Sequence, residues 1–163
     1  MIFYTADLHF HYEPFLPSRP FDTVENMDRQ LIHRWNEAVS EEDTVYVVGD
    51  VGYNRGLVPG DALSRLRGHK HLIRGNHDTG FENAGEMYRY FETVTDFNEI
   101  DDGEVHIILC QELICRGWFL PPNTYDCGSF VVNGTAVVGK ESKIPYNRCK
   151  SHRKELFFYE IYI

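Results

Sequence analysis

The chain has 163 residues, of which 42% are apolar, and a formal net charge of −9. This length predicts a single domain over residues 1–163, and the apolar content excludes a disordered chain. The acidic charge argues against a protein that binds long nucleic acids. The N-terminus lacks the basic segment of a secretory signal, and no apolar run approaches the about 20 residues that cross a bilayer. We therefore expect a cytoplasmic protein.

The first 110 residues are predicted to alternate between strands and helices. We expect strands over 2–6, 44–48, 71–74, 93–97 and 105–109, and helices over 24–39, 61–66 and 82–92. The first helix is the most strongly patterned, with apolar residues at helical spacing and capping-box spacing at Asp22 and Glu25. This order predicts an α/β layered fold, in which ligands bind beyond the carboxyl ends of the strands.

The composition changes after Cys110. Residues 1–110 carry 20 acidic and 9 basic residues, for a net charge of −11, whereas residues 111–163 carry 5 and 7, for a net charge of +2. Seven of the eight histidines precede position 111, and all four cysteines lie at or after position 110. In this second part we expect a β-hairpin over 129–138 with its turn at Asn133-Gly134, and a terminal strand or helix over 156–163.

Three polar clusters each follow a predicted strand directly. They are Asp7-Leu8-His9, Gly49-Asp50-Val51-Gly52 and Gly75-Asn76-His77-Asp78. Carboxylate and amide oxygens together with an imidazole nitrogen suit Mn, Fe, Zn or Ni. A bridging carboxylate at Asp50 could hold two such ions about 4 Å apart around a phosphate ester. A single cluster of this kind is typical of a surface turn, but three in this order indicate a metal site.

These ordered motifs, D-x-H, G-D and G-N-H-[DE], resemble those of the calcineurin-like metallophosphoesterases, especially the small bacterial and phage members, over residues 1–110. The resemblance implies a sandwich of mixed β-sheets flanked by helices. It also implies hydrolysis of a small phosphomonoester or phosphodiester, such as a nucleotide, by a metal-bound hydroxide. The metal ligands would be Asp7, His9, Asp50 and Asn76. Mn²⁺ is the expected ion, with Fe, Zn or Ni as alternatives, and the intact family site holds two ions.

The same resemblance implies roles for the last two residues of the third cluster. His77 would stabilise the phosphoryl charge or protonate the leaving oxygen. Asp78 would orient His77 as an outer carboxylate. Five other histidines are expected to be surface or strand-end residues, namely His11, His33, His69, His71 and His106. Arg55 and Arg74 could meet a phosphate, although the position of Arg74 before a turn favours a structural role.

The family completes its site with a His after a later strand, often in His-Tyr-Pro, and with a Gly-His-x-His motif. Here Gln111 follows the strand and Cys110, and Gly-His-x-His is absent. One interpretation is a frameshift near codon 110. A second is a diverged member with one metal or none, acting as a binding module. A third is a separate zinc site built from Cys115, Cys127, Cys149 and His152. A structural α/β domain without specific metal binding is a further alternative.

Overall fold

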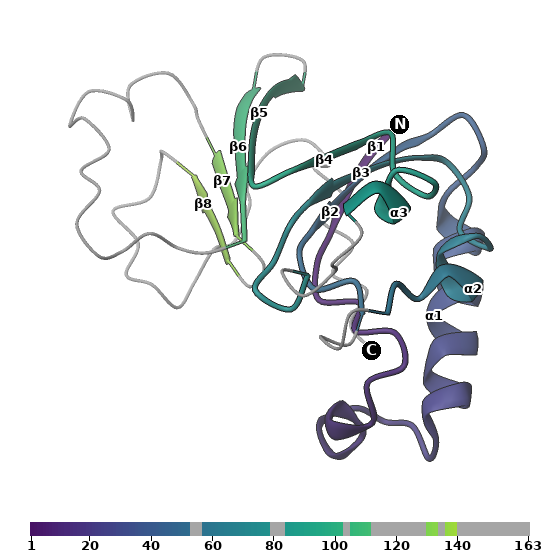
Figure 1. Ribbon diagram of the computed structural model, residues 1–163. Coiled ribbons are helices and arrows are strands. Elements are labelled where there is room, and N and C mark those ends of the chain that lie inside the picture. The colour runs from purple at the N-terminus through teal and green to yellow at the C-terminus, as the bar shows by residue number, and fades with distance from the viewer. Residues whose placement is uncertain (53–56, 79–83, 103–104, 112–129, 134–135, 140–163) are drawn as a thin grey trace.

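The computed structural model describes residues 1–52, 57–78, 84–102, 105–111, 130–133 and 136–139 (Figure 1). Its strands form two four-stranded sheets. The first sheet is parallel throughout, in the order β1 (Ile2–Thr5), β2 (Thr44–Val48), β3 (His69–Ile73), β4 (Thr93–Thr95). The second has the order β5 (Phe97–Asp102), β6 (Val105–Cys110), β7 (Phe130–Asn133), β8 (Ala136–Gly139). Its β5–β6 and β7–β8 pairs are antiparallel, and β6–β7 is parallel.

Within the described ranges, four helical segments accompany the first sheet. They are η1 (Glu13–Ser18), α1 (Val24–Ala38), α2 (Gly60–Leu63) and α3 (Ala84–Met87). The long helix α1 begins where predicted, but the side chain of Thr23, and not Asp22, caps it by accepting a hydrogen bond from the Asn26 amide at 3.1 Å. An extended Thr23 backbone allows this contact, which satisfies one of the free amides at the helix start.

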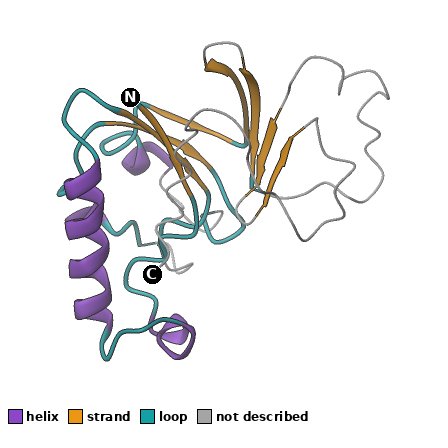
Figure 2. Cartoon of the chain, turned by 180° about the vertical axis from the view of Figure 1, so that it is seen from behind, coloured by secondary structure: helices purple, strands orange, loops and turns teal. Residues whose placement is uncertain are grey.

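Two apolar layers hold the elements together. Between α1 and the first sheet, Met27, Leu31 and Trp35 are almost fully buried, and the indole of Trp35 donates to the Arg67 carbonyl at 3.0 Å. Between the two sheets lies a smaller cluster that includes Tyr4, Val48, Ile73, Ile107 and Leu109. Figure 2 shows the resulting order of layers, with α1 on one side of the first sheet and the second sheet on the other. This is a mixed α/β arrangement, as predicted.

The structure refines several predicted boundaries. The strand expected over 93–97 is divided at Asp96, where the chain leaves the first sheet and enters the second. The helix expected over 82–92 is described only as α3, because residues 88–90 form turns and residues 79–83 lie outside the described ranges. The predicted hairpin is confirmed as β7–β8. However, Asn133 pairs with Ala136, so residues 134–135 connect the strands in place of Asn133-Gly134.

Two predictions reach past the described ranges. The terminal element expected over 156–163 lies outside them, and the assignment of residues 1–163 to one domain stays a prediction. Within the ranges that are described, no helix has the length and apolar character that crossing a membrane requires.

Candidate metal centre

Three loops meet at the carboxyl ends of β1, β2 and β3. These strands are parallel neighbours, so the residues that follow them emerge at the same edge of the sheet. The first two loops are joined through their backbones, since the Asp7 amide donates to the Gly49 carbonyl at 3.1 Å and the His9 amide donates to the Asp50 carbonyl at 2.9 Å. The predicted convergence of the clusters is therefore present in the structure.

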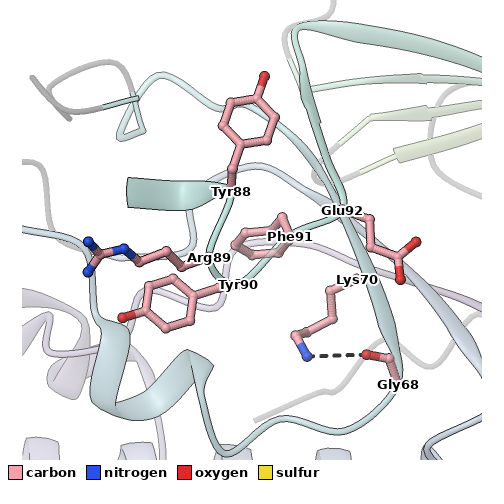
Figure 3. A pocket seen from close by; sticks show the side chains of 7 residues that line it. All are labelled: Gly68, Lys70, Tyr88, Arg89, Tyr90, Phe91 and Glu92. Atoms are coloured by element: carbon pink, nitrogen blue, oxygen red, sulfur yellow. Dashed lines mark hydrogen bonds between the residues drawn. The ribbon is translucent and has the colours of Figure 1, made fainter. Parts of the chain in front are cut away.

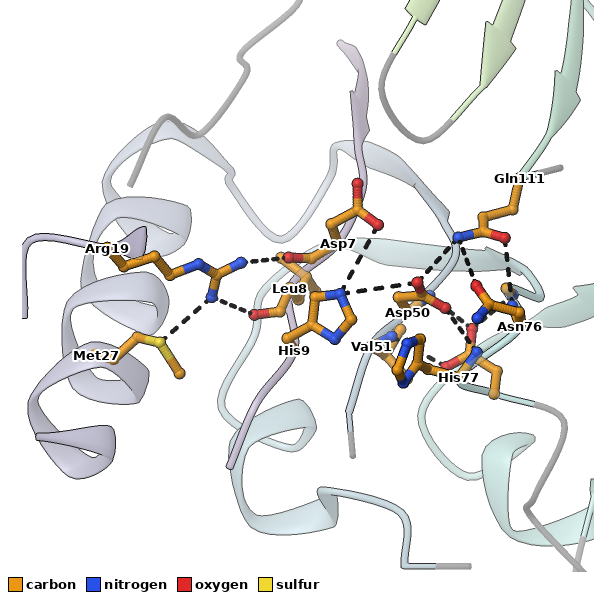
Figure 4. A network of polar contacts seen from close by, with 12 residues as sticks. Asp7, Leu8, His9, Arg19, Met27, Asp50, Val51, Asn76, His77 and Gln111 are labelled. Carbon is orange, nitrogen blue, oxygen red and sulfur yellow. Dashed lines mark hydrogen bonds and ion pairs between the residues drawn. The ribbon is translucent and has the colours of Figure 1, made fainter. Parts of the chain in front are cut away.

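Asp7, His9 and Asp50 present three ligand atoms to one point (Figure 4). All three atoms lie within 4.8 Å of one another. His9 Nε2 is 3.9 Å from Asp7 Oδ1 and 3.7 Å from Asp50 Oδ2. His9 and Asp50 are buried and Asp7 is partly exposed, which leaves one open side. Two carboxylates and an imidazole in this arrangement form a donor set suited to a divalent transition metal.

The backbone of the same three residues is strained. Asp7, His9 and Asp50 have φ values of 55°, 49° and 57°, in the left-handed region that residues with a β-carbon rarely adopt. Each residue in this region raises the conformational free energy of the folded chain by about 1 kcal/mol. Strain of this kind gathers where the surrounding structure must aim side chains at a functional point. Here it directs three side chains from two loops at a single position.

The electrostatics of the cluster favour a cation. Burial, reinforced by the negative charge of Asp50, raises the pKa of Asp7 to about 6. Burial lowers the pKa of His9 to about 3, with the positive charges of His77 and Arg19 acting in the same direction. The Gly52 backbone opposes this shift, and His9 Nδ1 has no hydrogen-bond partner among the described residues. His9 is thus neutral near pH 7, with a lone pair available for a metal.

Asp50 lies at the centre of the site and is held from two directions. Its Oδ1 accepts a hydrogen bond from the His77 amide at 2.9 Å, which leaves Oδ2 facing His9. Gly75 packs directly against this carboxylate, and a β-carbon at that position would overlap Asp50 Oδ1. The glycine is therefore needed for the loop after β3 to approach Asp50 closely.

Asp78 has different partners from those expected. Its Oδ2 accepts hydrogen bonds from the amides of Asp50 and Gly75, both at 2.8 Å, and its Oδ1 accepts from the Val51 amide at 3.0 Å. Burial raises the pKa of this carboxyl, and the amides act against that shift. No hydrogen bond joins it to the His77 ring, so the predicted orienting role is corrected. Asp78 fastens the loops after β2 and β3 to each other.

The ring of His77 lies beside the cluster, next to the aromatic rings of Tyr12 and Phe15. Its ring meets the His9 ring edge-on, with centroids 5.1 Å apart. Tyr12 lies 5.4 Å from the His9 ring and 5.8 Å from the His77 ring, and Phe15 lies 4.2 Å from the His9 ring. His77 Nδ1 is buried and has no hydrogen-bond partner among the described residues. Packing and the backbone contact to Asp50 thus position this ring next to the proposed metal ligands.

Arg19 is a residue of the site that the sequence did not reveal. Its guanidinium donates to the Asp7 carbonyl at 2.7 Å and to the Leu8 carbonyl at 3.0 Å, and it lies 5.1 Å from the centre of the Phe15 ring. It thereby supports the strained Asp7–His9 loop from the side that faces away from Asp50 (Figure 4). A single arginine in a loop of no recognisable motif carries no signal for this role.

Gln111 is the second such residue. It directly follows β6, the position at which the family pattern has a histidine. Its side-chain Nε2 donates to Asp50 Oδ2 at 2.9 Å and to Asn76 Oδ1 at 3.4 Å. Its side-chain Oε1 accepts from the backbone N–H of Asn76 at 3.3 Å. Asn76, predicted to be a ligand, is therefore joined to Asp50 through Gln111. The available signal was its position after the strand.

Most of the remaining candidates have structural partners. The ring of His11 bridges Asp28 and Asp61, at 2.6 Å and 2.8 Å. Arg74 makes a bidentate pair with Asp96, at 2.8 Å and 2.7 Å, which favours its structural role. Among the other histidines, His33 pairs with Glu37, His69 with Glu92, and His71 with Thr93. Arg55 and the Cys115, Cys127, Cys149 and His152 group lie outside the described ranges.

A separate hollow lies near the start of β3, away from the strand ends that carry the cluster. It is lined by Gly68, Lys70 and residues 88–92 (Figure 3). Lys70 Nζ donates to the carbonyls of Leu66 at 2.7 Å and Gly68 at 3.2 Å, and Glu92 pairs with His69. Lys70 and Glu92 therefore already have partners within the protein, and Arg89 is the third charged residue of the lining. Among the described residues the group of possible metal ligands is Asp7, His9 and Asp50, so this hollow does not compete with that cluster as a candidate metal site.

Sequence comparison finds relatives of undescribed activity. No protein-family model matches the chain. It is 36% identical over 95 residues to the uncharacterized protein MJ1445 of Methanocaldococcus jannaschii, an alignment that covers 56% of this chain and 52% of that protein. It is 35% identical over 79 residues to the Gene 66 protein of Mycobacterium phage L5, covering 46% and 38%. It is 30% identical over 102 residues to the Gene 66 protein of Mycobacterium phage D29, an alignment that covers 59% of this chain and 51% of that protein. The chain thus spans about half or less of these relatives.

Structural comparison supports the fold. A protein of unknown function from Aquifex aeolicus, AQ665, superimposes with a TM-score of 0.57 at 23% identity, covering 69% of this chain and 60% of that one. The E. coli phosphoesterase YfcE gives a TM-score of 0.40 at 14% identity, covering 69% and 57%. The first likeness indicates a shared fold, and the second is too low to carry an inference.

Proposed function

We propose that this chain hydrolyses a phosphomonoester or phosphodiester with the help of a divalent metal. The observation that carries the proposal is the convergence of Asp7, His9 and Asp50, whose ligand atoms lie within 4.8 Å of one another. The donor set fits a cation because the two carboxylates repel each other and the imidazole is neutral. Mixed oxygen and nitrogen donors are compatible with Mn²⁺, the ion that we expect, and also with Fe, Zn or Ni.

The protein groups around the cluster have separable roles in this proposal. A bound divalent cation would polarise the phosphoryl group and lower the pKa of a coordinated water. His77, held beside His9 by its backbone contact to Asp50, would protonate the leaving oxygen or stabilise the phosphoryl charge. Arg19 and Asp78 hydrogen-bond to the backbone of the loops that carry the ligands, and they would keep the ligands in position.

The substrate that we propose is a small phosphate ester such as a nucleotide. The partly exposed Tyr12 and Phe15 border the cluster and offer aromatic surface to a planar group. The net charge of −9 disfavours a long nucleic acid. We also retain the cytoplasmic location as a proposal.

A second candidate is a metal-binding module without turnover. It is favoured by Gln111, whose neutral amide lies between Asp50 and Asn76 where the family pattern has a histidine. In this alternative the Asp7, His9 and Asp50 cluster still binds a cation, but the site lacks the full set of groups that hold the phosphoryl oxygens in a two-metal hydrolase.

The two candidates are separated by hydrolysis assays on metal-stripped protein. Bis(p-nitrophenyl) phosphate and p-nitrophenyl phosphate are supplied with and without Mn²⁺, beside Asp50→Asn and the matched control Asp22→Asn, whose side chain is exposed. We expect Mn²⁺-dependent turnover that survives Asp22→Asn and is lost in Asp50→Asn. A folded protein that binds Mn²⁺ without hydrolysing either ester would support the binding module and contradict the hydrolase.

A further inference from the structure

The amide of Gln111 lies at the place where a second cation would have to sit. A second ion beside the first would need oxygens from both Asp50 and Asn76. Gln111 Nε2 already donates to Asp50 Oδ2 at 2.9 Å and to Asn76 Oδ1 at 3.4 Å. The hydrogen-bond pattern sets the orientation of the Gln111 side-chain amide, since its Oε1 accepts from the backbone N–H of Asn76 at 3.3 Å. A donor group therefore faces both oxygens in place of a metal (Figure 4).

The stem of this side chain is packed as well as hydrogen-bonded. Gly49 lies directly beneath it, and a β-carbon at Gly49 would overlap Gln111 Cγ. Gly49 also has a φ of 80°, so the turn after β2 needs glycine for its own conformation. Gln111 is thus seated against the backbone of the loop that carries Asp50, and its amide is held at that position.

The charges near the site match one divalent ion. Asp7 and Asp50 are the two carboxylates that face the cluster, and together they offset the charge of one such cation. Asn76 and Gln111 add no charge. The nearby carboxylate of Asp78 is turned onto three backbone amides. Among the described residues, no further carboxylate is directed at a second divalent cation, which would therefore bring two positive charges that these residues do not offset.

We propose that the site holds a single divalent ion at Asp7, His9 and Asp50, and that the Gln111 amide substitutes for a second ion by linking Asp50 to Asn76. The inference rests on the metal binding that underlies the proposed function, but it does not depend on turnover. It assigns Gln111 as a positioning residue that fixes the Asp50 carboxylate and the loop after β3 without contributing charge.

The test is the number of Mn²⁺ ions bound per chain. Metal-stripped protein is titrated with Mn²⁺, and bound ions are counted by calorimetry and by the electron paramagnetic resonance of free Mn²⁺. We expect one ion in the wild type and two in Gln111→Glu, which keeps the size of the side chain and adds a carboxylate beside Asp50. The two Mn²⁺ ions bound to Gln111→Glu should give the electron paramagnetic resonance spectrum of two magnetically coupled ions. Gln30→Glu on α1 is the matched control, and it should bind one.

The outcomes distinguish this inference from the proposed function. One ion in the wild type without hydrolysis supports the inference and contradicts the hydrolase. Two ions in the wild type overturn the inference while leaving hydrolysis possible, and no bound ion overturns both. If Gln111→Glu fails to fold, judged by its thermal unfolding, Gln111→His takes its place with Gln30→His as control. A folded variant at position 111 that still binds one ion counts against the role given to Gln111.

Discussion

The two sheets contribute to the same site in different ways. The carboxyl ends of β1 and β2 deliver Asp7, His9 and Asp50, which carry the charge and the strained backbone of the cluster. The end of β6 in the second sheet delivers Gln111, a neutral amide that makes hydrogen bonds only. The comparison teaches that the charged groups of the site come from one sheet, whereas the other sheet adds a neutral group that links Asp50 to Asn76.

The largest expected effect contrasts the charged ligand Asp7 with Asn76, the residue that Gln111 of the second sheet contacts. Asp7→Asn removes a charged ligand, so we expect Mn²⁺ affinity to fall by more than the about 10- to 100-fold typical of an outer partner. Asn76→Ala removes a neutral, exposed amide, so its loss should be smaller than about 10-fold. Calorimetric titration measures both. Equal losses in the two variants would show that Asn76 binds the ion as directly as Asp7 does, and would contradict the assignment of Asn76 as a partner of Gln111.

Removing the charge of Asp78 should destabilise the protein. Its buried carboxylate accepts hydrogen bonds from three backbone amides in the loops after β2 and β3. An Asn side chain at this position would direct an NH₂ group at an amide donor, so we expect Asp78→Asn to lower the free energy of unfolding by about 2–3 kcal/mol. Urea denaturation of the metal-stripped protein measures this. An unchanged midpoint with a selective loss of hydrolysis would instead restore the orienting role toward His77.

Arg19 should have an intermediate effect through the first loop. Lysine cannot donate to the Asp7 and Leu8 carbonyls with the same planar fork, so Arg19→Lys should weaken Mn²⁺ binding by about 10-fold. Arg29→Lys is the matched control, because Arg29 is exposed on α1 and contacts the Asn26 side chain. If both variants bind Mn²⁺ as the wild type does, the loop keeps its shape without the guanidinium.

The smallest effect is expected at the connection between the sheets. Arg74 follows β3 and pairs with Asp96, the residue between β4 and β5. Because both side chains are exposed, Arg74→Ala should lower the free energy of unfolding by less than about 1 kcal/mol and leave the KM for either ester unchanged. A KM that rises several-fold would mean that Arg74 contacts the phosphate, the role that its ion pair argues against.

Local patterns predicted the elements that depend on neighbours in the sequence. Helix α1 followed from its apolar spacing and its polar start, although the capping residue proved to be Thr23. Strand β2 followed from a short β-branched and aromatic run. The division of the strand expected over 93–97 was not predictable in the same way, because pairing with β3 on one side of Asp96 and with β6 on the other side decides it.

The sequence by itself determined which side chains could bind a metal and that they would gather, because residues after adjacent parallel strands emerge at one edge of the sheet. Only the tertiary structure decided how the site is completed. It brought Gln111 to Asp50 across 61 positions and turned Asp78 onto the backbone of a loop 28 positions earlier. The physical reason is that such hydrogen bonds join groups that follow separate strands. The approach of Asp78 to Asp50 depends on the pairing of β2 with β3, and the approach of Gln111 depends on the packing of the two sheets.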